Sequence, residues 1–177
     1  MRALRALTLF FLILGLGVAP VLGNGGKGKT TVYRAEVRQG EGEPIQFSAE
    51  LEAILFRLNS VRNKYKVVRV KIVNDSSNSL KLSPDQDKIE LLFNTGEAPM
   101  QGILNLSKRD AALWDSLPAD LRQALAYPRI VEAGEEENVF VFIADPNLAR
   151  LPRHIRYHVA SLPDPVEMRD ITAAAKR

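Results

Sequence analysis

The alternation of apolar and polar residues is most regular between Tyr65 and Asn74, where the chain runs YKVVRVKIVN. Val68, Val70 and Ile72 share one parity, and the residues between them are basic. Successive side chains of an extended chain point to opposite faces, so this pattern predicts a strand with one apolar and one wet face. β-Branched residues dominate the run, and turn-forming residues occupy positions 74–79, so we expect an inner strand that ends there.

Shorter segments repeat this strand pattern, separated by residues that favour turns. The expected strands cover residues 30–38, which we place at the edge of a sheet, and residues 88–93, 100–106, 129–132, 139–144 and 154–162. Many short strands with turns between them predict a mainly β, antiparallel β-sandwich. We place this single domain at residues 30–165, after a flexible leader at 24–29 and before a partly helical or frayed tail at 166–177.

Residues 45–58 fit two interpretations. Apolar and polar residues alternate from Ile45 to Ala53, which is typical of a strand. The segment is also rich in helix-forming residues, and Phe47, Leu51 and Leu58 fit a helical spacing. We favour the strand because its alternation has few exceptions, and a loop at residues 59–64 would then lead into the next strand.

Residues 107–128 break the rhythm of strands. Ser107 can serve as an N-cap, with Asp110 three residues later as in a capping box, and Pro118 suits the first turn of a second helix. Leucines recur at every fourth position from 113 to 125. An apolar stripe at helical spacing is ordinarily buried, so we predict a short helical excursion that packs over one end of the sheet.

The first 23 residues have the three parts of a secretory signal peptide. Arg2 and Arg5 precede an apolar run from Leu7 to Val18, and small residues follow up to Gly23. We predict cleavage near Gly23, export to the periplasm or the extracellular space, and no membrane span after cleavage. The alternative is a retained anchor, but the apolar run is shorter than the ~20 residues of a typical span.

Cleavage would also change the charge of the protein. The whole chain has 24 Lys and Arg against 21 Asp and Glu, and two of the basic residues precede position 24. The remainder is close to neutral and lacks the excess of basic residues that nucleic acids require, so we expect no nucleic-acid partner. The chain has no cysteine, which excludes disulfides, thiol nucleophiles and thiolate metal ligands.

The remaining catalytic chemistry is sparse. His154 and His158 are the only histidines. On a strand they lie ~13 Å apart at ~3.3 Å per residue, which is too far to share a metal ion. The chain also lacks the Gly-x-Ser-x-Gly elbow of serine hydrolases and the ordered aspartates of a calcium loop. We therefore predict no catalytic residue, no metal site and no cofactor.

Two blocks of the chain resemble a known family. The frame V-x-V-x-I-x-N at positions 68–74 is followed by a Ser/Asn turn, and Ala-Gly-Glu at 133–135 precedes the apolar run at 139–142. Both are similar to elements of bacterial secreted immunoglobulin-like domains, in the group of telokin-like secreted antigens and related domains of unknown function. The resemblance implies an exported immunoglobulin-like β-sandwich without established catalytic residues, and it identifies no site.

These observations predict an exported, non-catalytic protein of the bacterial cell envelope or secretome that acts by binding another protein. The candidate binding residues are Trp114, Leu117 and Tyr127 in the excursion, beside exposed strand edges, although large apolar residues are more often core. The alternative is a small-ligand binder or hydrolase with a pocket between excursion and sandwich, lined by Trp114, Tyr127, Asp115 and Asp120. A third possibility is an accessory subunit of a secretion or pilus-like assembly.

Overall fold

The structure, a computed structural model, describes residues 31–38, 42–51, 58–93, 96–146, 148 and 150–171. The predicted signal peptide and leader lie outside the described residues. Within the described ranges, no helix has the length and apolar character needed to cross a membrane.

The described part of the chain is mainly β, with short helices grouped in the middle of the sequence. The strands are β1 (Val32–Val37), β2 (Gly42–Leu51), β3 (Lys66–Ser76), β4 (Leu80–Lys81), β5 (Lys88–Leu92), β6 (Met100–Gly102), β7 (Ile130–Val131), β8 (Glu136–Ile143), β9 (His154–His158) and β10 (Val166–Asp170). The helices are α1 (Asn59–Arg62), α2 (Leu106–Arg109), α3 (Ala111–Ser116) and α4 (Ala119–Leu125).

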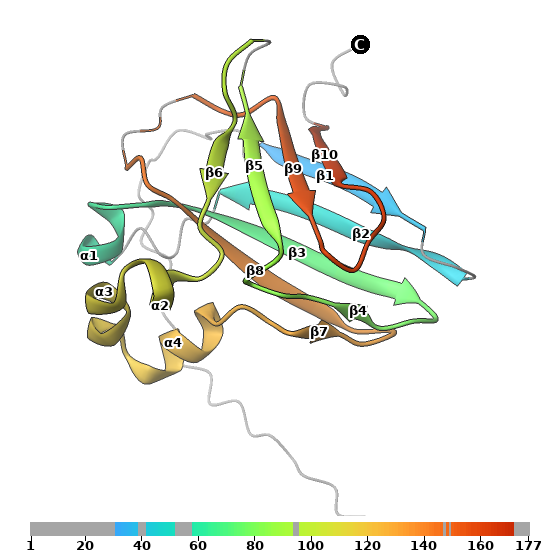
Figure 1. The fold of residues 1–177 in the computed structure, drawn as a ribbon, viewed down its shortest axis with the longest axis horizontal. Coiled ribbons are helices and arrows are strands. Elements are labelled where there is room, and N and C mark those ends of the chain that lie inside the picture. The colour runs from blue at the N-terminus through green and yellow to red at the C-terminus, as the bar shows by residue number, and fades with distance from the viewer. Residues whose placement is uncertain are drawn as a thin grey trace, which may run out of the picture.

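Eight strands form one antiparallel sheet in the order β6-β5-β9-β10-β1-β2-β3-β8, and β4 pairs with β7 in a separate ribbon. The two ends of the large sheet meet where Ile103, just after β6, pairs with Phe142 of β8 through hydrogen bonds of 2.8 and 2.9 Å. The sheet is therefore a nearly closed barrel (Figure 1). The predicted mainly β, antiparallel fold with a helical excursion is confirmed, whereas the immunoglobulin-like sandwich is not.

Strand β3 is an inner strand, as its pattern predicts, because it pairs with β2 on one side and β8 on the other. It continues beyond the expected end at Asn74 to Ser76. Asn74 is fully buried, and its side-chain amide donates to the carbonyls of Asn78 and Val131 at 2.8 and 2.9 Å. These bonds satisfy the buried amide and tie the end of β3 to the β4–β7 ribbon.

Two predictions about the ends of the domain are wrong. Strand β1 was expected at a sheet edge, but it lies between β10 and β2. Its second neighbour is the segment expected to be a partly helical or frayed tail, since residues 166–170 form β10 with Val166 and Met168 buried. Residues 172–177 lie outside the described residues. Two apolar positions between prolines and charges were too short a pattern to indicate this strand.

The ambiguous segment 45–58 is a strand as far as the structure describes it. Strand β2 runs to Leu51, which confirms the strand prediction up to that residue, and residues 52–57 lie outside the described ranges. The expected loop at 59–64 instead contains the short helix α1, whose Val61 is fully buried.

Alternate residues of β3 and β8 belong to two different cores. Val68 and Val141 point into the barrel, where Phe47 and Tyr157 meet edge to face with ring centroids 6.2 Å apart. Val67 of β3 and Phe142 of β8 point outward and pack against the helices. This second cluster comprises Val61, Tyr65, Val67, Leu106, Leu113, Leu117, Leu125 and Phe142. Both faces of β8 are covered, one by the barrel core and the other by the helices. This explains why residues 139–143 are all apolar.

Candidate functional site

The predicted excursion is present as α2, α3 and α4, which lie together beside one end of the barrel (Figure 1). Its first cap differs from the prediction. The side chain of Asn105, rather than Ser107, accepts from the Lys108 N–H at 3.2 Å, while the Ser107 hydroxyl donates to Asn105 Oδ1 at 2.6 Å. Asp110 caps α3 by accepting from the Leu113 N–H at 3.1 Å.

Asp110 also fastens the excursion to the barrel. Its second carboxylate oxygen accepts from Lys64 Nζ at 2.8 Å and from the Tyr65 hydroxyl at 3.2 Å. The hydrogen bond from Lys64 is the main reason that the pKa of Asp110 lies below its ordinary value. One carboxylate thus joins the start of α3 to the residues that precede β3.

The structure separates the three predicted binding residues. Leu117 is only 4% exposed and belongs to the second core. Trp114 packs at the margin of that core and is half-buried. Trp114 and Tyr127 both line a cavity of about 210 Å³ between the excursion and the barrel, which we call the excursion cavity. Its lining comprises Pro84, Leu104, Asn105, Leu106, Ser107, Trp114, Leu125, Ala126, Tyr127 and Arg129.

The carboxylates expected in this pocket lie elsewhere. Asp115 and Asp120 are exposed on the helices and do not line the excursion cavity. Asp115 lies 4.0 Å from the guanidinium of Arg122. The acid–base pair that a hydrolase would need is therefore not assembled in this cavity by Asp115 and Asp120.

Tyr127 is held in place by a buried polar network. Its hydroxyl donates to Asp87 Oδ2 at 2.6 Å and lies 2.5 Å from the Tyr157 hydroxyl. Asp87 also accepts from the backbone N–H groups of Ser83 and Ala160, both at 2.7 Å. Burial raises the pKa of both phenols above their ordinary value, so they stay neutral. The network therefore fixes the position of Tyr127 in the cavity wall.

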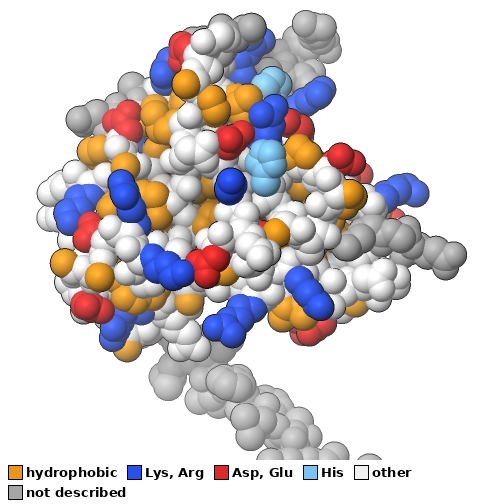
Figure 2. Space-filling model, viewed as in Figure 1, with side chains coloured by type: hydrophobic (Ala, Val, Ile, Leu, Met, Phe, Trp, Pro, Cys, Tyr) orange, Lys and Arg blue, Asp and Glu red, His pale blue; other side chains and the backbone are white. Residues whose placement is uncertain are grey.

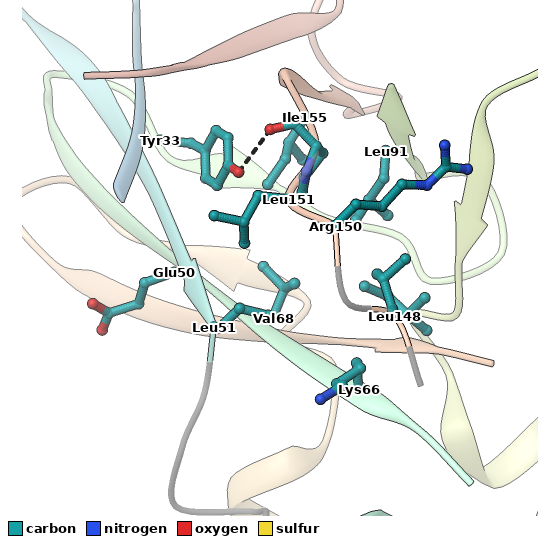
Figure 3. Close-up of a pocket in the computed structure, with 12 residues that line it drawn as sticks. Tyr33, Glu50, Leu51, Lys66, Val68, Leu91, Leu148, Arg150, Leu151 and Ile155 are labelled. Atoms are coloured by element: carbon teal, nitrogen blue, oxygen red, sulfur yellow. Dashed lines mark hydrogen bonds between the residues drawn. The ribbon is translucent and has the colours of Figure 1, made fainter. Parts of the chain in front are cut away.

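A second hollow, which sequence reasoning missed, opens at the rim of the barrel (Figure 3). We call it the mouth pocket; its volume is about 70 Å³. Leu51 and Leu151 line it and are 40% and 47% exposed. The Tyr33 hydroxyl donates to the Pro152 carbonyl at 2.7 Å and ties β1 to the segment before β9. The other lining residues are Glu50, Lys66, Val68, Leu91, Ile143, Leu148, Arg150 and Ile155.

Two charged side chains that line the mouth pocket, Arg150 and Glu50, are paired with residues outside it. Arg150 stacks over the Phe93 ring at 4.4 Å from its centroid and pairs with Glu97 at 2.7 Å. Glu50 pairs with Arg69 of the neighbouring strand. The pocket floor is therefore apolar and its rim is polar, an arrangement typical of a site that receives an apolar side chain.

The described residues contain no group of three or more His, Asp and Glu side chains placed to hold a metal ion. His158 instead lies beside Glu90, with His158 Nε2 3.7 Å from the carboxylate. Basic and acidic side chains are interspersed on the face shown in Figure 2. That face carries no broad basic area of the kind that binds nucleic acid.

Comparisons of the chain with protein-family models, curated proteins and solved structures found no match. The resemblance to secreted immunoglobulin-like domains therefore stays a prediction, and the excursion cavity and the mouth pocket are the candidate sites of function.

Proposed function

We propose that this protein is an exported, non-catalytic binding protein that acts by contact with another protein. The observation that carries this proposal is the mouth pocket, where an apolar hollow opens between two strongly exposed leucines, Leu51 and Leu151. Exposed apolar side chains that adjoin a hollow are more typical of an interaction site than singly scattered ones. The pocket is the size of a side chain rather than of a metabolite.

The partner would present one aliphatic side chain to this pocket. Interfaces concentrate their binding energy where a buried anchor fills a pocket and a polar rim excludes water. The floor at Val68, Leu91 and Ile155 is rigid because these residues lie on paired strands of the barrel. A rigid pocket loses little conformational entropy when an anchor enters it.

Export and the finer fold are parts of this proposal that rest on sequence. The signal peptide at residues 1–23 supports a periplasmic or extracellular protein of a bacterial envelope or secretome. The immunoglobulin-like resemblance supports the same location. Mass spectrometry of the protein recovered from periplasm and medium tests export and cleavage near Gly23, and a cytoplasmic protein retaining residues 1–23 would refute export.

Photo-crosslinking in the producing cell tests the interaction. A crosslinking residue at position 151 should trap a specific partner, whereas one at position 130 should not. Ile130 is the matched control because it is an exposed large hydrophobic residue, 38% accessible, on the separate β4–β7 ribbon. Leu51→Glu should abolish the crosslink from position 151 without lowering the melting temperature. Absence of a crosslink at 151, or equal trapping at both positions, would refute the mouth pocket as an interface.

A further inference from the structure

The excursion cavity is separate from the mouth pocket and shares no lining residue with it. At about 210 Å³ it is three times as large. An apolar protein cavity of roughly 150 Å³ accepts benzene, so the excursion cavity has room for a ligand built on one aromatic ring.

The walls of the cavity suit a flat apolar group. Leu104, Leu125 and Ala126 supply aliphatic surface, and Trp114 and Tyr127 supply aromatic surface. Aromatic side chains favour stacked or edge-to-face contact with another ring. The Tyr127 ring cannot turn away easily, because its hydroxyl is bonded to both Asp87 and Tyr157.

The charged residue in the lining of the excursion cavity is Arg129, which is positive. Arg129 lines both the excursion cavity and a neighbouring hollow, and its backbone is fixed by a 2.8 Å hydrogen bond from the Leu82 N–H to its carbonyl. Among the described residues, no carboxylate pairs with Arg129. Asp87 lies behind the wall, and both its oxygens already accept hydrogen bonds from protein groups.

We propose that the excursion cavity binds a small aromatic carboxylate, with its ring against Trp114 and its carboxylate on Arg129. A guanidinium offers paired donors that match a carboxylate. A cavity with aliphatic and aromatic walls and a few polar groups, here Asn105, Ser107 and Arg129, is the usual form of a small-ligand site. This binding would be an activity in addition to contact with a protein at the mouth pocket, and neither depends on the other.

The chain contains a built-in probe for this site, because Trp114 is its only tryptophan. Phenylacetate should change the emission of Trp114 saturably at millimolar concentrations. 2-Phenylethanol, which keeps the ring and replaces the carboxylate by a hydroxyl group, should bind about tenfold more weakly or worse, because a charge-assisted hydrogen bond is lost. A change that grows linearly with concentration, as collisional quenching does, would overturn the proposal.

Variants locate the site. Arg129→Gln should weaken phenylacetate binding about tenfold or more and leave 2-phenylethanol binding unchanged. Arg169→Gln, at an exposed arginine of β10 that does not line the cavity, is the control and should bind both compounds like the wild type. Leu151→Glu should also bind phenylacetate normally. Wild-type affinity in Arg129→Gln, or loss of binding in Leu151→Glu, would refute the assignment without bearing on the protein contact.

Discussion

Tyr127 donates a hydrogen bond of 2.6 Å to Asp87, and this pair joins the excursion to the barrel. Tyr127 follows α4, whereas Asp87 precedes β5 and is only 5% exposed. Through Asp87 the phenol is connected to the backbone of Ser83 and of Ala160. The α4–β7, β4–β5 and β9–β10 connections therefore converge on one carboxylate.

Tyr127→Phe should therefore destabilise the protein by about 1–3 kcal/mol, because it leaves buried partners without a hydrogen bond. The measurement is the free energy of unfolding from urea denaturation. Tyr65→Phe is the matched control, since its hydroxyl makes a 3.2 Å bond to the more accessible Asp110, and it should cost less. Equal losses in the free energy of unfolding for the two substitutions would show that the Asp87 network stabilises the protein no more than the bond between Tyr65 and Asp110.

Gly102 determines how closely β6 approaches the other end of the sheet. A Cβ at this position would come closer than 3.0 Å to side-chain carbons of Val141 and Ile89. Gly102→Ala should cost about 1–3 kcal/mol by overpacking. It should also speed amide hydrogen exchange at Ile103 and Phe142, where the barrel closes.

Gly134 provides the contrast, because it has open space around it but a φ of 79°. Gly134→Ala should lower the free energy of unfolding, because alanine disfavours a positive φ. Gly134→Asn should lower it less, since asparagine adopts this conformation more readily. Asn at position 102 should instead be worse than Ala, since it is larger. Recovery by Asn at both glycines would contradict the steric account of Gly102.

The sequence predicted most strands correctly because their burial follows local alternation, as in β3 and β9. It did not predict the closure of the barrel, which depends on contacts between distant segments. One neighbour of β1 is β10, which lies far from it in the sequence. The pairing of Ile103 with Phe142 requires a glycine at position 102, because a Cβ there would clash with Val141 of the opposite end of the sheet. No local pattern carries that information.

The candidate sites were predictable to different degrees. Trp114 and Tyr127 could be grouped because both belong to one helical excursion. Leu117 was named as a binding candidate although its leucine stripe predicts a buried position, and the structure places it in the second core. The mouth pocket was missed because Leu51 continues the buried parity of β2, yet it lies at the barrel rim and is exposed.

Val70→Asn tests the central place of β3. Val70 is fully buried between β2 and β8, so the amide would lose water without a ready partner and should cost at least about 2 kcal/mol. Val73→Asn, on the half-buried outward face of the same strand, should cost clearly less. Thermal unfolding of the two variants measures the difference, and similar melting temperatures would contradict the assignment of Val70 to the barrel interior.

Glu90 should make stability depend on pH. Gln101 Nε2 donates to its carboxylate at 2.9 Å, and this bond, with smaller contributions from His158 and Arg156, lowers the pKa of Glu90 below its ordinary value. A carboxyl group with a lowered folded-state pKa stabilises the protein fully above its unfolded-state pKa of ~4.3 and loses that stabilisation as pH falls through the folded-state value. Glu90→Gln should therefore be less stable than the wild type at pH 7.

The two proteins should converge in stability as the pH is lowered below 4, because the wild-type carboxyl group then becomes neutral as well. Urea unfolding at a series of pH values measures this convergence. Glu132→Gln is the control, since Glu132 is exposed and should show a small difference at every pH. A deficit of Glu90→Gln that stays constant across the series would mean that packing, rather than the charge of Glu90, stabilises the β5–β6–β9 surface.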